Sequence, residues 1–248
     1  LISLLYRKLK YCYLVKNKIR LSIIVPVFNE EKTILSILQK MSVLKNDAEI
    51  EIIIINDGST DNTQKILEKN TKLYTKLINL SKNSGKGKAV IEGLKSANFE
   101  YVVFQDADLE YDPFDLKMFL TKIEKYNADL VIGSRFIGNQ RSVLNFWHMV
   151  GNKFITILFN VLNNTTFSDI YCCYIVYKKN NLMVEKLKSF KWGQHAEILT
   201  FLMKNSKKIY EIGINYDARR YDEGKKIRYY HVFSVVYWIL ITRFKTLF

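Results

Sequence analysis

Short apolar runs alternate with amphipathic stretches along the first half of the chain. The runs are rich in branched residues and predict buried strands over Leu21–Val27, Ile50–Ile55, Lys76–Leu80, Tyr101–Gln105 and Leu130–Gly133. The stretches between them predict helices over residues 30–44, from Thr60 or Asp61 onward, over 89–97 and over 114–126, with Asn29 as the cap of the first. Strands and helices alternating at this spacing predict an α/β fold with a mainly parallel, Rossmann-like sheet flanked by helices.

The second half of the chain is less regular. Its pattern predicts an amphipathic helix over Val143–Asn163, a helix over Glu197–Lys204, and strands over Ile170–Tyr177 and Ile209–Tyr216. We therefore expect a basic segment over residues 1–20, one catalytic domain over 21–228, and an aromatic, basic tail over 229–248. The apolar runs are too short or too polar to cross a bilayer, so the amphipathic helix and the tail are expected to lie in a membrane interface.

Charge and cysteine usage narrow the class of partner and the compartment. The 248 residues include 38 Lys and Arg against 24 Asp and Glu, a net charge of +14 that indicates an anionic partner: nucleic acid, a membrane face or a phosphorylated substrate. Three cysteines, of which Cys172 and Cys173 are adjacent, cannot form a disulfide framework, and this favours a cytoplasmic protein. No recognised nucleic-acid motif is present, so nucleic acid is not the expected partner.

Polar motifs follow the predicted strands. The carboxyl ends of strands in such sheets meet at one edge, where ligands bind. Asp106 and Asp108, with Glu110, follow a buried apolar run and could surround Mg²⁺ or Mn²⁺, which would bridge a donor diphosphate to the carboxylates. Asp57 follows another run and could accept hydrogen bonds from a base or ribose. The plain alternatives are a solvated acidic loop and an ordinary turn.

Basic and polar residues elsewhere are further candidates. The loop Asn83–Lys88 suits a phosphate through its backbone amides and Lys86, although it lacks the P-loop spacing. Arginine forks match phosphate oxygens, which makes candidates of Arg135, Arg219 and Arg220. His195 and Glu197 could face a sugar, or could be structural.

Taken together, VPVFNEE, NDGSTDNT, NSGKGKA, QDADLE and GSRF resemble glycosyltransferase family 2, with its GT-A fold. SDIYCCYIVYKK and YDARRYDEGKKIRY resemble the dolichyl- or polyprenyl-phosphate mannose or glucose synthases within that family. The match covers residues 21–243. The family usually has DDGS where this chain has Asn56 and Asp57, and many relatives have Gly at the position of Cys173.

The resemblance implies a role for each matched residue. Nucleotide-sugar binding falls to Pro26, Phe28, Glu30, Asp57, Lys86, Asp106, Ala107 and Asp108. The metal falls to Asp106, Asp108 and Glu110, and the lipid phosphate to Arg135, Arg219 and Arg220. The catalytic set is Asp106, Asp108, Arg135 and Arg219, while Asp169 is a candidate sugar contact beside His195 and Glu197.

The expected activity is inverting transfer of mannose or glucose from a GDP- or UDP-hexose to a polyprenyl or dolichyl phosphate. A lipid phosphate is largely ionised at neutral pH, so this reaction needs no strong general base. The enzyme is expected to be peripheral at the cytoplasmic face of an anionic membrane, and a separate membrane subunit is a further candidate partner. The alternatives are transfer to a sugar hydroxyl with Glu197 or Asp169 as the base, a basic nucleic-acid-binding module, and an inactive partner subunit.

Overall fold

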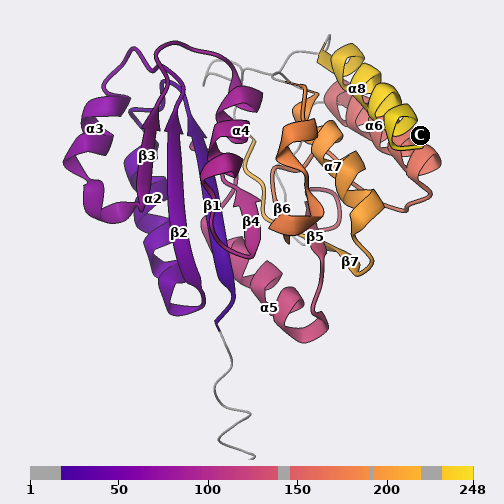
Figure 1. Ribbon diagram of the computed structural model, residues 1–248, viewed down its shortest axis with the longest axis horizontal. Helices are drawn as coiled ribbons and strands as arrows, with labels where there is room; N and C mark the ends of the chain where they lie inside the picture. The colour runs from indigo at the N-terminus through magenta and orange to yellow at the C-terminus, as the bar shows by residue number, and fades with distance from the viewer. Residues whose placement is uncertain (1–17, 139–145, 190–192, 219–230, 248) are drawn as a thin grey trace, which may run out of the picture.

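Seven strands pair in the order β3-β2-β1-β4-β6-β5-β7 in the computed structural model, which describes residues 18–138, 146–189, 193–218 and 231–247 (Figure 1). The strands are β1 (Arg20–Val27), β2 (Glu49–Asn56), β3 (Lys76–Asn79), β4 (Tyr101–Phe104), β5 (Leu130–Ser134), β6 (Ile175–Lys178) and β7 (Ile209–Gly213). β6 runs antiparallel to both its neighbours, β4 and β5, and the other pairs are parallel. The predicted α/β fold with a mainly parallel sheet is confirmed.

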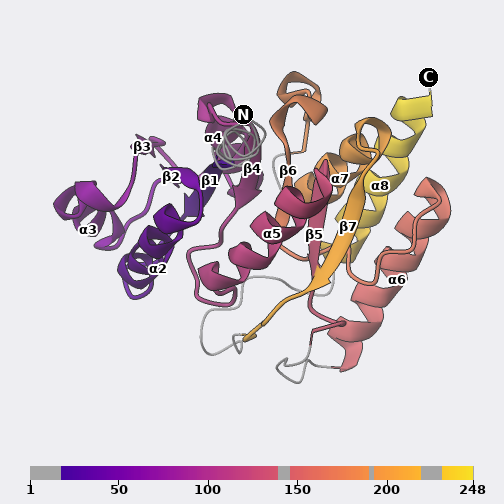
Figure 2. The same ribbon diagram turned by 90° about the horizontal axis from the view of Figure 1, so that it is seen from below.

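Helices lie in the connections between the strands, and one more helix follows the last strand. They are α2 (Ile34–Ser42), α3 (Thr63–Lys69), α4 (Lys86–Ser96), α5 (Leu116–Tyr126), α6 (Phe146–Asn163), α7 (Gln194–Asn205) and α8 (His231–Leu247). Short 3-10 turns cover Val43–Asn46, Thr71–Leu73, Pro113–Asp115, Lys179–Asn181 and Val184–Lys186. Figure 2 shows α6 and α8 side by side at the end of the sheet remote from α3.

Helix α4 packs directly on β1 and β2. Gly93 makes this close approach possible, because a Cβ there would collide with the side chains of Ile24 and Ile55. The strands beneath are almost completely buried, as their unbroken apolar runs predict. The carboxyl ends of β1 and β2 lie side by side, with Val27 opposite Asn56.

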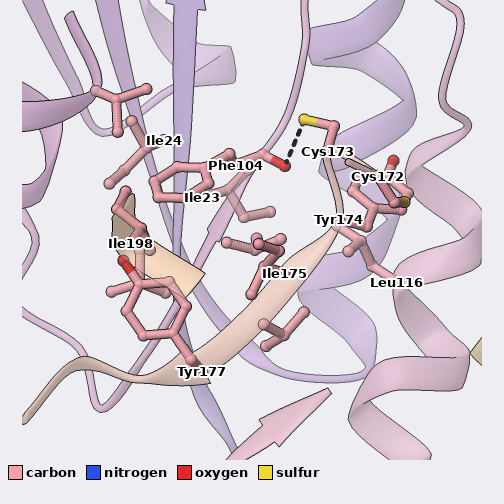
Figure 3. Close-up of a cluster of buried hydrophobic side chains, with 14 of the residues drawn as sticks. Ile23, Ile24, Phe104, Leu116, Cys172, Cys173, Tyr174, Ile175, Tyr177 and Ile198 are labelled. Carbon is pink, nitrogen blue, oxygen red and sulfur yellow. Dashed lines mark hydrogen bonds between the residues drawn. The ribbon is translucent and has the colours of Figure 1, made fainter. Parts of the chain in front are cut away.

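A second part of the core joins the two halves of the chain. Phe104 of β4, Tyr174 and Tyr177 from the β6 region, and Ile198 of α7 are buried together (Figure 3). The Cys173 Sγ lies 3.6 Å from the carbonyl oxygen of Phe104. Cys172 and Cys173 are both free thiols, as expected from the cysteine count.

Helices α6 and α8 each expose an apolar stripe. On α6 it comprises Phe146, Trp147, Val150, Phe154, Ile157 and Val161, and on α8 it comprises Phe233, Tyr237 and Phe244. Trp147 is 77% exposed and Phe233 is 74% exposed. Within the described residues, no helix is long and apolar enough to cross a membrane.

Several local expectations were wrong. Asn29 does not cap a helix: it has a left-handed backbone (φ 53°), its side chain accepts the amide of Thr60, and α2 begins only at Ile34. The strand predicted over Ile170–Tyr177 begins only at Ile175, because Asp169 and Tyr171 are drawn into side-chain contacts. Arg20 is the first residue of β1, and the predicted domain boundaries stay predictions.

Candidate active site

The strand ends place the predicted residues along one edge of the sheet. Asp57 follows β2, Asp106 follows β4 and Arg135 follows β5. Because β6 is antiparallel, Cys173 reaches the same edge from the start of its strand. The structure therefore confirms that these segments converge, as the parallel order predicts.

Asp57 shapes the glycine-rich loop. Its Oδ1 accepts the amide of Ser84 and its Oδ2 accepts the amide of Gly85, each at 2.8 Å. Gly58 beside it has φ +68°, and a Cβ there would lie 2.6 Å from the Lys82 carbonyl carbon, so only glycine fits this turn. Both carboxylate oxygens thus hold the loop that starts α4, and the predicted contact of Asp57 with a base or ribose stays a prediction.

Lys86, the first residue of α4, reaches across to the strand-end acid. Its Nζ lies 2.5 Å from Asp106 Oδ1, and the Lys86 side chain is 45% exposed against 18% for Asp106. Burial alone would raise the pKa of Asp106, but the ammonium of Lys86 outweighs it and holds that pKa below its usual range. The lysine and the acid, both predicted nucleotide-sugar residues, are therefore one ion pair.

The loop after Asp106 contains a strained turn. Leu109 has a left-handed backbone (φ 65°), a conformation uncommon for a large side chain, and the amide of Glu110 donates to Asp108 Oδ1 at 3.2 Å. Glu110 Oε2 accepts the hydroxyl of Tyr216 at 2.9 Å. Asp108 and Glu110 are both fixed in place by these contacts.

These acids do not form a ready-made metal cage. Among the described residues, no three His, Cys, Asp or Glu side chains are grouped as metal ligands. Asp106 is paired with Lys86, and Glu110 with Tyr216. Mg²⁺ and similar ions are often held by one or two carboxylates together with substrate phosphates. The carboxylates of Asp108 and Glu110 fit a metal ion shared with a diphosphate, and metal binding by this chain stays a prediction.

Arg135 has a partner that the sequence did not predict. Its Nε lies 2.7 Å from Asp169 Oδ2 and its Nη2 lies 2.9 Å from Asp169 Oδ1, and both residues are buried. Its guanidinium also lies 5.2 Å from the ring centre of Tyr216. Burial would raise the pKa of Asp169, but Arg135 outweighs it and lowers that pKa. The Nε and Nη2 donors of Arg135 are therefore bound by Asp169. The predicted phosphate contact of Arg135 and the predicted sugar contact of Asp169 stay predictions.

His195 lies near both ion pairs. Burial, then the charge of Lys86, lower the pKa of His195 to about 4, so the imidazole is neutral at pH 7. Its Nε2 is buried with no hydrogen-bond partner, and its ring centre lies 5.4 Å from that of Tyr171. A buried, unpaired ring nitrogen suits a ligand hydroxyl, which supports the predicted sugar contact.

Glu197 is engaged away from these groups. Its carboxylate accepts the backbone amides of Lys188 and Ser189 at 2.9–3.1 Å, and the side chain is 2% exposed. Burial raises its pKa. Glu197 holds a turn before α7, so a sugar contact by Glu197 has no support in this geometry.

The remaining predicted residues lie near the end of β1 and in the acidic loop. Pro26 pairs with Ile55 within the sheet, Glu30 Oε2 accepts the hydroxyl of Thr33, and Ala107 is buried. Phe28 lies between Pro26 and Glu30 and is partly buried. Arg219 and Arg220 lie outside the described residues.

Sequence reasoning missed three side chains that organise this edge. Gln105 accepts the hydroxyl of Tyr174 at 2.6 Å, Glu211 accepts the amides of Ser168 and Asp169, and Tyr216 donates to Glu110. Gln105 directly precedes Asp106, and this position is a signal that could have found it, whereas Glu211 lies in the middle of β7 and gives no such signal.

An α/β sheet with paired acids and bases at its carboxyl edge suits the binding of a charged nucleotide ligand. The sequence agrees: residues 22–183 match the family model of glycosyl transferase family 2, and the chain belongs to that family. It is therefore a glycosyltransferase.

Several known proteins are similar in sequence to this chain. The chain is 33% identical over 222 residues to an uncharacterized protein of Methanocaldococcus jannaschii, with 82% of this chain and 93% of that protein covered. It is 27% identical to the undecaprenyl-phosphate 4-deoxy-4-formamido-L-arabinose transferase of Proteus mirabilis, with 65% of this chain and 49% of that protein covered. It is 31% identical to the dolichol-phosphate mannosyltransferase of Pyrococcus furiosus, with 48% of this chain and 34% of that protein covered.

A solved structure supports the fold. Glucosyl-3-phosphoglycerate synthase from Mycobacterium tuberculosis, crystallised with Mn²⁺, UDP-glucose and phosphoglyceric acid, matches with a TM-score of 0.66 at 18% identity, covering 91% of this chain and 80% of that chain. The GT-A fold expected from the resemblance is confirmed.

Proposed function

We propose that this chain transfers mannose or glucose from a GDP- or UDP-hexose to a polyprenyl or dolichyl phosphate at the cytoplasmic face of a membrane. An oxygen of the lipid phosphate attacks the anomeric carbon, forming one C–O bond. The bond from that carbon to the donor diphosphate breaks, and its electron pair leaves with the nucleoside diphosphate. Attack from the side opposite the leaving group inverts the anomeric centre.

The donor side is supported by the Asp57-anchored loop and the Lys86–Asp106 pair. The amides of Ser84 and Gly85 are held by Asp57, and the Lys86 ammonium at the start of α4 is the group that suits phosphate oxygens. Mg²⁺ or Mn²⁺ held by Asp108 and Glu110 would neutralise charge on the leaving diphosphate. Asp108 and Glu110 would orient the diphosphate, and Lys86 would contact it.

The state of the candidate bases favours a phosphate acceptor over a hydroxyl. A hydroxyl acceptor needs a general base poised near neutral pH. Asp169 is ionised but bound to Arg135, Glu197 is bound to backbone amides, and the pKa of His195 lies at about 4. A lipid phosphate is already ionised, so its attack requires none of these residues as a base.

The observation that carries the lipid assignment is the pair of exposed apolar stripes on α6 and α8. Both helices contact segments that carry the predicted sugar contacts Asp169 and His195. Lys153 of α6 donates to the Ser168 carbonyl, next to Asp169, and Trp238 of α8 packs on Gly193, just before His195. Apolar stripes with basic neighbours suit a membrane interface, where a polyprenyl chain would reside. The predicted phosphate ligands Arg219 and Arg220 lie in the segment that leads into α8.

A donor screen tests the proposal. Purified protein with Mn²⁺, a polyprenyl phosphate and radiolabelled UDP- or GDP-hexoses should give lipid-extractable product, which excess EDTA and Asp108→Asn should abolish. Arg219→Ala should raise the KM for lipid phosphate without changing donor affinity, and Arg219→Lys should do so less. Label appearing only on sugar hydroxyl acceptors, with full activity in Arg219→Ala, would establish the alternative family-2 reaction instead.

A further inference from the structure

Tyr216 lies shortly after β7, next to the acidic loop that follows Asp106. Its hydroxyl donates to Glu110 Oε2 at 2.9 Å, and the side chain is only 7% exposed. A carboxylate oxygen can only accept, so the tyrosine hydroxyl is the donor in this hydrogen bond. A buried tyrosine thus donates to one of the predicted metal-binding acids.

The backbone around Tyr216 is fastened to the loop that follows Asp106. Tyr216 forms an antiparallel bridge with Tyr111, and the amide of Asp217 donates to the Glu110 carbonyl at 3.1 Å. The amide of Asn215 donates to Asp115 Oδ2 at 2.8 Å. These contacts set the position of the Tyr216 Cα without using its hydroxyl.

The Tyr216 ring is held as firmly as its backbone. The ring of Tyr111 lies 5.1 Å away, centre to centre, and the guanidinium of Arg135 lies 5.2 Å from the Tyr216 ring centre. Arg135 is itself locked to Asp169. The hydroxyl therefore has a fixed position from which to orient Glu110.

We infer that Tyr216 is a positioning residue for the metal site: its hydroxyl fixes the Glu110 carboxylate in the orientation in which Glu110 and Asp108 hold a metal ion on the donor diphosphate. The inference rests on the proposed function, in which a metal ion holds that diphosphate. Hydrogen bonds to metal-binding carboxylates are a general means of setting ligand geometry. Tyr216 contacts both Glu110, through its hydroxyl, and Arg135, through its ring. It therefore joins the acidic loop that follows Asp106 to the Arg135–Asp169 pair.

Tyr216→Phe removes only the hydroxyl, so it is the test variant. Calorimetric titration of Mn²⁺ in the presence of UDP, and in parallel of GDP, should give an apparent Mn²⁺ affinity about 10-fold or more weaker than wild type. Nucleotide affinity without metal should not change. The KM for Mn²⁺ in turnover should rise by the same factor, with kcat recovering at saturating Mn²⁺, a rescue that general loss of structure would not permit.

Two further variants make the test specific. Tyr177→Phe is the matched control, because the Tyr177 hydroxyl is also buried but has no hydrogen-bond partner, and its Mn²⁺ affinity should equal wild type. In a Glu110→Ala background, Tyr216→Phe should have no further effect on Mn²⁺ affinity, since Tyr216 acts through Glu110.

Two results would overturn the inference: unchanged Mn²⁺ affinity in Tyr216→Phe, or an undiminished effect of Tyr216→Phe in the Glu110→Ala background. If the wild-type protein bound no Mn²⁺ in the presence of UDP and none in the presence of GDP, the metal role in the proposed function would fail as well. The Mn²⁺ titration of the wild type therefore distinguishes failure of the proposed function from failure of the inference about Tyr216.

Discussion

Lys86 Nζ lies 2.5 Å from Asp106 Oδ1, so the first acid of the predicted metal motif already has a cation beside it. Burial would lower the pKa of Lys86, but Asp106 reverses this and raises it, so the lysine stays charged. The Lys86 ammonium would repel a metal ion that approaches Asp106. The diphosphate of a nucleotide-sugar would attract the ammonium away from Asp106. We therefore expect metal binding to depend on the nucleotide.

Lys86→Gln should bind Mn²⁺ more tightly than wild type in the absence of nucleotide, because Asp106 loses its counter-ion. The same variant should bind UDP or GDP more weakly by about 10-fold, the usual size of a lost charged hydrogen bond. Calorimetry with Mn²⁺ alone and with nucleotide alone measures both changes. Lys95→Gln is the control: Lys95 pairs with Glu92 at 3.2 Å near the other end of the same helix, so both affinities should match wild type. Weaker Mn²⁺ binding in Lys86→Gln would contradict the idea.

Asp169→Asn should destabilise the protein by about 3–5 kcal/mol, because it leaves the buried Arg135 guanidinium without a counter-ion. The pKa of Asp169 is lowered in the folded state, so its contribution is fully present above the unfolded value near pH 4 and is lost as the pH falls through the folded value. Urea unfolding at several pH values measures this. Asp47→Asn, in a half-exposed pair with Lys117, should cost less than about 1 kcal/mol. Equal losses for both variants would show that the buried pair contributes nothing special.

His195 should make the fold sensitive to mild acid. Its pKa is lowered to about 4 by burial and by Lys86, so the unfolded chain takes up a proton first as the pH falls below about 6.5. Stability should decline between pH 6.5 and 4, by about 2 kcal/mol at pH 5 from this residue. His195→Asn should lack that decline in urea unfolding at pH 8 and pH 5. The same pH dependence in variant and wild type would refute the prediction.

The exposed stripes of α6 and α8 should insert into anionic vesicles. Replacing both Trp147 and Phe233 by Ser should weaken binding to phosphatidylglycerol-containing liposomes by at least about 10-fold, because each large apolar side chain contributes on the order of 1–2 kcal/mol when buried. Co-sedimentation at low and high salt measures apolar and charge contributions separately. Met183→Ser, at a 53% exposed methionine outside these helices, is the control. If the wild-type protein does not co-sediment with these liposomes at low salt, the prediction of membrane binding is wrong.

The sheet could be predicted from the sequence because its strands carry unbroken apolar runs. Ile52–Ile55 and Val102–Phe104 are buried on both faces, and burial of that kind leaves a signal within a few neighbouring residues. The position of Asp106 at a strand end followed from the same signal. The cluster of polar motifs at one edge then followed from the parallel order of the strands.

The partners of the site residues could not be predicted in the same way. Arg135 and Asp169 are 34 residues apart, and Glu110 and Tyr216 are 106 apart, so no local periodicity connects either pair. The ion pair of Arg135 could not be foreseen, because an isolated arginine in a sequence gives no hint of a buried carboxylate facing it. Asn29 looked like a helix cap because the competing contact with Thr60 comes from another loop.

Because β6 runs antiparallel to its neighbours, the segment before it and the segments after the other strands meet at the same sheet edge. The segments after β1, β2 and β4 arrive at this edge as strands end, whereas Asp169 and Cys173 arrive before β6 begins. Asp169 and Cys173 are therefore held by their contacts with Arg135 and Phe104, and not by the pairing of a strand that leads to them. A change in the length of that stretch would therefore be felt first at the Arg135–Asp169 pair and at the contact of Cys173 with Phe104.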